Sequence, residues 1–188
     1  MTKDQNAPGR LNRIRQFVNT IDFEKPGADD QLADASRAAA WLAEFGFPEP
    51  LGAEELSSLR QFRETIRAIL LANNGDGDPD LAWRTLAELA HRTPVDIVLE
   101  RDGSCRLAPC TEGGAAAVKA DLLATIYDAV RDGSWRRMKA CRKGSCLWAF
   151  YDHSKNGSGA WCSMATCGNR VKAQRRRSKQ APLSSPAT

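Results

Sequence analysis

Four cysteines near the C-terminal end of the chain have the spacing of a metal site. Cys141 and Cys146 form one C-x4-C pair, Cys162 and Cys167 form a second, and fifteen residues separate the two pairs. Zinc prefers a closed tetrahedral shell of thiolate or imidazole ligands, and two short loops with two cysteines each commonly provide such a shell. We therefore expect one Zn2+ ion bound by Cys141, Cys146, Cys162 and Cys167. Disulfide bonds are the alternative use of these residues.

The compartment decides between metal and disulfides. The N-terminal residues MTKDQNAPGR lack the hydrophobic region of an export signal. No apolar run approaches the roughly 20 residues that a membrane-spanning helix needs. We therefore expect a cytoplasmic protein with no membrane partner. In that reducing compartment, closely spaced cysteine pairs more often hold metal than form disulfides.

A third C-x4-C pair, Cys105 and Cys110, competes for the metal. Cys105 lies in a predicted apolar strand, where a free cysteine is usually a small buried apolar residue. In contrast, the segment from Cys141 to Cys146 contains Gly144, which can adopt a positive φ and allow backbone N–H groups to point at the sulfurs. The two C-terminal pairs are therefore favoured, and we expect Cys105 and Cys110 to bind no metal.

The charge of the chain is divided between its two parts. Residues 131–188 contain 13 of the 27 Lys and Arg but two of the 23 Asp and Glu, which gives a formal charge of +11. Residues 1–130 contain 14 and 21, which gives −7. This asymmetry predicts an acidic body and a basic module that contacts a polyanion. Alternatively, part of the positive charge compensates the local charge of −2 that four thiolates around one zinc ion would carry.

The elements that must position the cysteines follow from hydrophobic periodicity. Helices are expected over residues 11–23, 31–46, 52–73, 80–92 and 113–132. In the last two helices the expected buried residues are Leu81, Trp83, Leu86 and Leu89, and Val118, Leu122, Ile126, Tyr127 and Val130. Two β-prone runs flank Asp102-Gly103 and predict an antiparallel hairpin over residues 95–110.

The segment that carries the four cysteines predicts a small module of its own. Residues 147–161 alternate in polarity and turn at Asn156-Gly157, which predicts a second hairpin. Cys167 opens a helix whose N-terminus favours a thiolate. We therefore expect an α+β protein. It would comprise a mainly helical domain with a small β-hairpin over residues 1–134, a ribbon-like or treble-clef-like zinc module over 135–179, and a disordered tail over 180–188.

The cations of this module make DNA or RNA its expected partner. They are Arg142, Lys143, Lys155, Arg170, Lys172, Arg175, Arg176 and Arg177. The last five lie around one short helix and can contact successive phosphates. The alternative is a solvated helix end. Trp148, Phe150 and Trp161 can stack on unpaired bases, or form a small core around the zinc, which we favour.

Enzymatic interpretations have little support. Asp152, His153 and Ser154 are the residue types of a hydrolytic triad. However, neighbours on an extended chain point to opposite faces and cannot form the relay. A site closed by four cysteines also leaves no open position for a catalytic water. We expect the protein not to be an enzyme.

The stretch CLWAFYDHSKNGSGAWCSMATCGNRVKAQRRR resembles the signature of the CGNR zinc-finger family, whose name is spelled by residues 167–170. In that family the finger follows an N-terminal ABATE domain, described as a putative stress-induced transcription regulator. Phe17-Val18-Asn19-Thr20 is similar to the opening motif of that domain. The resemblance implies a zinc-binding regulator of transcription in which Cys141, Cys146, Cys162 and Cys167 are the zinc ligands.

The chain departs from the family in one place that bears on function. Many members carry an arginine-rich loop before the tryptophan, where this chain has Asn156-Gly157-Ser158-Gly159-Ala160 and keeps Lys155. The nucleic-acid binding that the resemblance implies is weakened accordingly. Two functions remain open: a non-enzymatic regulator that binds nucleic acid, and a protein-interaction or small-ligand-sensing domain whose zinc is purely structural.

Overall fold

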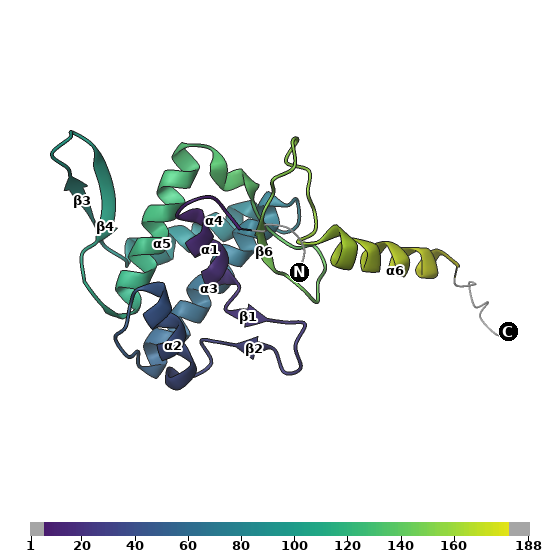
Figure 1. Cartoon of the computed structure of the whole chain (residues 1–188), viewed down its shortest axis with the longest axis horizontal. Coiled ribbons are helices and arrows are strands. Elements are labelled where there is room, and N and C mark those ends of the chain that lie inside the picture. The colour runs from purple at the N-terminus through teal and green to yellow at the C-terminus, as the bar shows by residue number, and fades with distance from the viewer. Residues whose placement is uncertain (1–5, 181–188) are drawn as a thin grey trace.

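The N-terminal part of the molecule is built around one long central helix. The computed structural model describes residues 6–180. Its first five helices are α1 (Leu11–Val18), α2 (Ala35–Phe45), α3 (Ala53–Asn73), α4 (Pro79–His91) and α5 (Gly114–Arg131). The other four pack against α3 or against each other (Figure 1). Leu59, Phe62, Ile66 and Ile69 on α3 are fully buried, and they form the centre of the core.

Three antiparallel strand pairs complete the described part of the chain. These are β1 (Ile21–Asp22) with β2 (Asp29–Asp30), β3 (Val95–Leu99) with β4 (Cys105–Pro109), and β5 (Met138–Ala140) with β6 (Ala149–Tyr151). A 3-10 turn, η1 (Ser134–Arg137), precedes β5. A π-helical turn, η2 (Met164–Gly168), leads into α6 (Asn169–Gln180), which projects away from the rest (Figure 1). Within residues 6–180, no helix is long and apolar enough to cross a membrane.

The five predicted helices and the hairpin around Asp102-Gly103 are confirmed, with shifted ends. The first helix stops at Val18 because the chain turns at Asn19 and Thr20 into β1. The second begins at Ala35, because the side chain of Asp34 caps it by accepting a hydrogen bond from the Arg37 amide. The expected disordered tail begins at residue 180, and residues 181–188 lie outside the described part of the chain.

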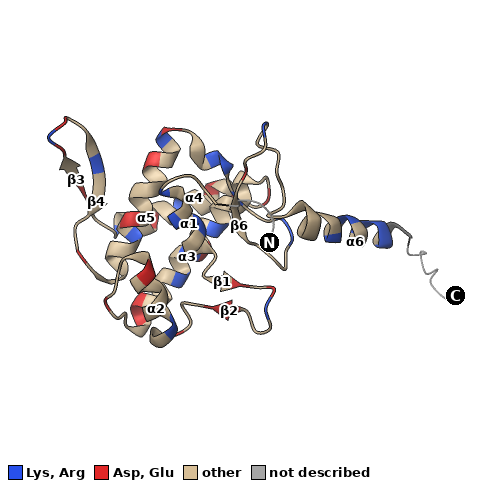
Figure 2. Ribbon diagram, in the orientation of Figure 1, with Lys and Arg blue, Asp and Glu red and all other residues tan. Residues whose placement is uncertain are grey.

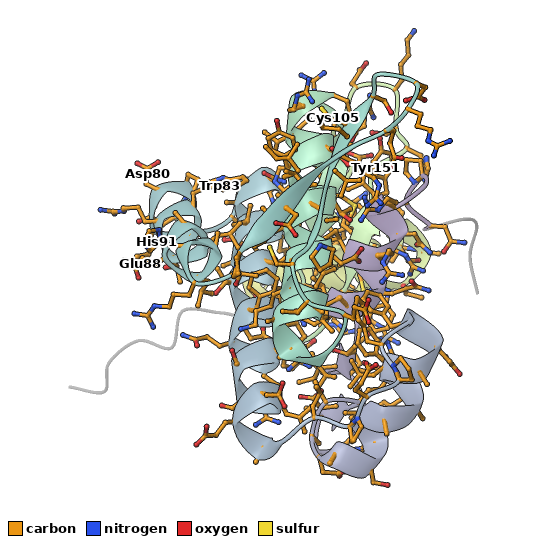
Figure 3. All side chains as sticks on the ribbon, turned by 90° about the vertical axis from the view of Figure 1, so that its left-hand side faces the viewer. Asp80, Trp83, Glu88, His91, Cys105 and Tyr151 are labelled. Atoms are coloured by element: carbon orange, nitrogen blue, oxygen red, sulfur yellow. The ribbon has the colours of Figure 1, made fainter. Side chains whose placement is uncertain are left out.

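The expected buried sets of the fourth and fifth helices are partly wrong. Leu81 and Trp83 on α4 and Tyr127 and Val130 on α5 are exposed. Trp83, labelled on α4 in Figure 3, is 37% exposed and makes a T-shaped contact with the buried Trp135, with the ring centroids 6.3 Å apart. The principal neighbour of α4 is α3, so only a narrow stripe of α4 is covered, and Ala82 and Leu86 are its buried residues.

The expectation that Cys105 is a buried apolar residue is also wrong. Cys105 and Cys110 are both exposed. β4 packs against α5, but the tip of the β3–β4 hairpin projects beyond it (Figure 1). No second layer of the described structure covers the tip, so Ile97 and Leu99, in register with Leu107 and Cys105, are 70% and 79% exposed.

The hairpin of the C-terminal module forms with a different partner strand from the one predicted. β6 pairs with β5, which precedes the first cysteine pair. The chain does turn at Gly157, which has a φ of 61°, but no strand pair flanks that turn. Met138, Ala140 and Ala149 are fully buried in the same core as α3. The β5–β6 hairpin is therefore part of the helical body as well as of the cysteine-bearing module.

Two arginines on α3 are buried, which the hydrophobic pattern did not indicate. Arg63 donates to both carboxylate oxygens of Asp30, at 2.7 and 2.9 Å, and to the hydroxyl of Thr20. Arg67 donates to the carbonyl oxygens of Val18 and Leu147, at 2.6 and 2.8 Å. Both guanidinium groups also pair with Glu64. These contacts fix β1 and β2 and the start of β6 to the central helix.

Substitution of Asp30 by asparagine should lower the free energy of unfolding by about 3 kcal/mol, because it removes the carboxylate that binds two nitrogens of the buried Arg63 and leaves only the half-exposed Glu64 to balance this charge. Asp29→Asn is the matched control. Asp29 pairs with the exposed cations Lys25 and Arg37, so its loss should cost less than about 1 kcal/mol. Urea unfolding at pH 7 measures both values. Equal losses in the two variants would contradict the assignment of Asp30 to a buried ion pair.

The same comparison has a pH dependence. Burial raises the pKa of Asp30, but hydrogen bonds from Arg63 and from the Leu32 amide outweigh it and hold that pKa below its ordinary value. A carboxyl with a lowered folded-state pKa contributes stability at neutral pH and loses it as the pH falls. The difference between wild type and Asp30→Asn should therefore shrink below about pH 4.

Candidate metal centre

The structure brings together the four cysteines that the sequence analysis singled out. Cys141 follows β5, Cys146 lies five residues further on, Cys162 lies in the loop after β6, and Cys167 lies in η2. Their four Sγ atoms all lie within 4.8 Å of one another. The Sγ of Cys162 is 3.6 Å from that of Cys146 and 3.7 Å from that of Cys167.

These separations fit a tetrahedral metal site. Four sulfurs at about 2.3 Å from a central zinc ion lie about 3.8 Å from each other. A disulfide needs a sulfur–sulfur distance of about 2.05 Å, and none of the six cysteines, all of which lie within the described residues, forms a disulfide. Cys141, Cys146 and Cys167 are buried and Cys162 is partly buried. A donor set of four thiolates with this burial fits a closed, structural zinc site.

The pKa values of three of the thiols show why a bound cation would favour the ionisation of the cluster. Hydrogen bonds from Cys146 and Cys162 lower the pKa of Cys141 to about 2. The same contact with Cys141 raises the pKa of Cys146 to about 12, and contacts with Cys141 and Cys146 raise that of Cys162. One thiolate therefore forms readily and opposes ionisation of its neighbours. A divalent cation at the centre would remove this opposition.

The first pair of cysteines is held by a tight turn between β5 and β6. The amide of Cys141 donates to the carbonyl of Trp148, and the amides of Cys146 and Leu147 both donate to the carbonyl of Lys143. The residue with positive φ is Leu147, at 54°, and not Gly144 as the sequence predicted. Leu147 is held in this conformation because its carbonyl oxygen accepts a hydrogen bond from the buried Arg67.

The second pair of cysteines belongs to the turn that starts α6. The hydroxyl of Ser163 caps η2 by accepting a hydrogen bond from the amide of Thr166. A Cβ at Gly168 would lie 2.4 Å from the Sδ of Met164 and 3.0 Å from the ring of Trp161. A side chain at position 168 would therefore displace Met164 and crowd Trp161 beside Cys167. The expectation that the last cysteine sits by a helix N-terminus is confirmed, with one π-helical turn between.

The aromatic residues of the module form a core. Trp148 and Trp161 are partly buried and pack against the cysteine cluster, and Phe150 is buried. For the two tryptophans this arrangement agrees with the small core around the metal site that the sequence favoured over exposed stacking platforms, whereas Phe150 is buried but does not belong to the cysteine cluster.

Side chains of the helical body satisfy the backbone of the module. The side-chain amide of Asn19 makes two hydrogen bonds with the backbone of Ala149. It donates to the carbonyl oxygen at 2.9 Å and accepts from the N–H at 2.7 Å. Asn74 donates to the carbonyl oxygens of Ala140 and Ala160. Together with the contact from Arg67, these bonds position both sides of the cysteine cluster from α3 and the end of α1.

An ion pair that sequence reasoning missed closes the loop after β6. Lys139 and Asp152 are buried and lie 2.8 Å apart. Lys139 also donates to the carbonyls of Gly157 and Gly159, and Asp152 accepts from the amides of Ser154 and Gly159. Burial raises the pKa of Asp152, but its hydrogen bonds lower it to about 2. The alternation of polar and apolar residues along a strand does not indicate this ion pair.

The three residues of triad type are not arranged as a relay. Asp152 pairs with Lys139, and His153 bonds through Nε2 to the carbonyl of Asn6. The hydroxyl of Ser154 accepts from the amide of Ser158.

The predicted nucleic-acid contacts fall into two groups. Lys143 and Arg170 lie beside the cysteines and both pair with Glu24 from the β1–β2 loop. Arg142, Lys155, Lys172, Arg175, Arg176 and Arg177 are exposed and form no ion pair within the described residues, whereas Arg170 is exposed and paired. In Figure 2 the ribbon of α6 has basic positions and no acidic ones.

Comparison with known families matches both parts of the chain. Residues 12–132, more than half of the chain, match the family ABATE, described as "Putative stress-induced transcription regulator". The chain belongs to the ABATE family. Residues 137–180 match the CGNR zinc finger. No curated protein matches the sequence.

The structure explains why an ABATE chain with this finger would need the residues Phe17-Val18-Asn19-Thr20. Phe17 is buried in the core. The carbonyl of Val18 accepts from Arg67, the side chain of Asn19 pairs with β6, and the hydroxyl of Thr20 accepts from Arg63. In Cys167-Gly168-Asn169-Arg170, the cysteine joins the cluster, the glycine allows close packing, Asn169 donates to the carbonyl of Ala165, and Arg170 pairs with Glu24.

Replacement of Cys162 by serine should abolish stoichiometric metal binding, because three thiolates and a hydroxyl form a much weaker shell than four thiolates. The matched control is the double variant Cys105→Ala, Cys110→Ala, which removes the exposed C-x4-C pair and should keep one metal ion per chain. Elemental analysis of the purified variants measures the content. Full metal content in Cys162→Ser, or its loss in the folded control, would show that the wrong cysteines were assigned.

Metal removal should destabilise the helical body as well as the finger, because β5 and β6 belong to the same core as α3. A chelator should therefore lower the midpoint of the whole unfolding transition, since a ligand that binds only the folded state stabilises everything that unfolds with its site. Hydrogen exchange at α3 amides, with and without chelator, measures this effect. Unchanged protection of α3 would mean that finger and body unfold separately.

Proposed function

We propose that the protein is a non-enzymatic transcription regulator that binds nucleic acid through α6, with a zinc ion at Cys141, Cys146, Cys162 and Cys167 holding that helix in place. Membership of the ABATE family supports the regulatory role. The converging cysteines and the match to the CGNR zinc finger support zinc. Such a regulator would work in the cytoplasm, where thiols stay reduced.

The observation that carries the proposal is the free cationic surface of α6. Its sequence NRVKAQRRRSKQ has six Lys and Arg, and no Asp or Glu. Lys172, Arg175, Arg176 and Arg177 are exposed, and within the described residues none of them has an ion pair. A helix that is polar all round gains little from packing. A polyanion bound along α6 would supply the partner that these cations lack within the described residues, and it would explain the composition of the helix.

The geometry of α6 gives it two different sides. At 3.6 residues per turn, Lys172, Arg175 and Arg176 share one face, whereas Arg170 and Arg177 lie on the other. Arg170 is engaged by Glu24. The 12 residues of α6 span about 18 Å, and a helix of ordinary diameter enters the major groove of DNA. We therefore assign the face with Lys172, Arg175 and Arg176 to phosphate contacts.

The zinc ion would have a structural task. It would tie the turn after β5 to the start of α6, so that the helix leaves the body in a fixed direction. Glu24 pairs with both Lys143 and Arg170 beside the four thiolates, and its single carboxylate offsets one of their two positive charges. Comparison of the affinities for a DNA duplex and a single-stranded RNA distinguishes the two ligands.

A second candidate function is protein interaction or small-ligand sensing by the helical body, with zinc purely structural. One observation favours it. A shallow apolar groove of about 300 Å³ lies between α4 and α5. Its lining includes the exposed residues Trp83, Tyr127 and Val130. Binding there would depend on apolar contact and would change little with salt.

The zinc-loaded protein should bind DNA or RNA with an affinity that falls steeply with salt, because each phosphate contact releases about one counterion. The triple variant Lys172→Ala, Arg175→Ala, Arg176→Ala should lower the affinity at least about 10-fold and reduce the log–log salt slope by about two to three. Fluorescence anisotropy with a short mixed-sequence DNA duplex and a single-stranded RNA, from about 50 to 200 mM salt, measures both quantities.

The matched control removes the same number of exposed charges elsewhere. Arg84→Ala, Arg92→Ala, Arg101→Ala takes three cations from α4 and the β3–β4 hairpin, and its affinity should stay within about twofold of wild type at matched salt. If both triple variants weaken binding equally, the attraction is a property of net charge and not of α6. If zinc-loaded wild type binds neither probe at low salt, the second candidate function replaces this proposal.

A further inference from the structure

A basic cavity lies at the junction of the helical body and the finger. It has a volume of about 490 Å³ and is lined by Asn73 at the end of α3, Arg136 and Arg137 of η1, Lys139 of β5, and Lys155, Asn156 and Gly157 of the loop after β6. Four of these seven residues are cations and none is acidic. No residue of α6 contributes to it.

Two of the four cations shape the cavity. Lys139 is buried and its charge is balanced by Asp152 at 2.8 Å. Arg137 donates to the carbonyl oxygens of Asp152 and Ser154, at 2.9 and 2.8 Å, and has no carboxylate partner within the described residues. These contacts pin the loop against η1 and hold the mouth of the cavity in a defined shape.

Among the described residues, the other two cationic side chains have no hydrogen-bond or ion-pair partner. Arg136 and Lys155 are exposed, and neither side chain donates a hydrogen bond or forms an ion pair within the described part of the chain. Arg136, Arg137 and Lys155 therefore place three uncompensated positive charges around one cavity. Like charges held close together disfavour the empty state and favour an anion that lies between them.

We propose that this cavity binds a phosphate group. The planar guanidinium of Arg136 can bind two phosphate oxygens at once, and Lys155 adds a point charge from the loop after β6. The volume falls within the range of about 300–1,000 Å³ that is usual for small-ligand sites and exceeds what a lone phosphate ion needs. The phosphate therefore belongs to a larger molecule, either a free phosphorylated compound or the backbone of a nucleic acid.

The remaining lining groups suit a hydroxylated ligand. The Nδ2 of Asn73 is used by the carbonyl oxygens of Trp135 and Met138, so its own carbonyl oxygen is the group left to accept a bond from a ligand. Asn156 presents a second, exposed amide on the loop. Because body and finger each supply a wall, a bound phosphate would tie the loop to η1. The site is separate from the α6 surface of the proposed function.

The test is calorimetric titration of the zinc-loaded full chain with pyrophosphate, with a nucleoside triphosphate and with a short DNA duplex. Sodium sulfate at equal ionic strength is the reference anion. The double variant Arg136→Ala, Lys155→Ala removes no hydrogen bond or ion pair of the described residues and should fold normally, and it should weaken phosphate binding at least about 10-fold. The control Arg175→Ala, Arg176→Ala removes two charges from α6 and should change pyrophosphate binding by less than about twofold.

Each result has one meaning for the proposal. Saturable binding of pyrophosphate or the triphosphate that the cavity variant loses and the α6 control keeps identifies a free phosphorylated ligand. If only DNA binds, and the cavity variant weakens it, the phosphate comes from nucleic acid. The proposal is overturned if none of the three probes binds saturably, if sulfate competes equally, or if the cavity variant binds like wild type. Loss of DNA binding in the α6 control alone concerns the proposed function and not this cavity.

Discussion

The structure depends on how the short β5–β6 hairpin satisfies its backbone. A two-stranded pair of three residues a strand is marginal by itself, and its buried N–H and C=O groups need partners. The helical body supplies them from side chains: Asn19 pairs with Ala149, Asn74 binds the carbonyls of Ala140 and Ala160, and Arg67 binds that of Leu147. The cysteine turn is therefore built on the body. A metal bound there stabilises a hairpin whose other face is already core.

The same constraint explains two charged residues inside the helical body. A buried guanidinium is costly unless its donors are used. Arg67 donates hydrogen bonds to carbonyl oxygens of two distant segments, and Arg63 donates to Asp30 and Thr20. Each arginine thus joins turns that have few apolar residues of their own. The body holds its loops by polar contacts from α3, while apolar contacts hold helix to helix.

This division accounts for what the sequence predicted and what it did not. Period-3.6 patterns report packing of helix on helix, so α3 and the existence of all five helices of the body were predictable, and Asp102-Gly103 identified the β3–β4 turn. The cysteine spacing predicted the cluster at Cys141 and its partners. The pairing of β5 with β6 was not predicted because β5 is three residues long and the hairpin is stabilised by side chains that lie far away in the sequence. The positive φ of Leu147, in place of Gly144, could not be predicted for the same reason. The carbonyl oxygen of Leu147 accepts a hydrogen bond from Arg67, which lies far away in the sequence.

Long-range contacts also decide which part of the basic charge can meet a partner. The C-terminal segment has a formal charge of +11, but Lys139 is balanced by Asp152, and Lys143 and Arg170 share the single charge of Glu24. Part of the positive charge beside the thiolates is thus offset within the protein. Two groups of cations without an ion pair in the described part of the chain lie on the outer face of α6 and around the cavity beside η1. A polyanion that approached this end of the molecule would meet a helix that starts beside the cysteine cluster and a cavity whose loop is held by the bonds of Lys139 and Arg137 to its carbonyl oxygens.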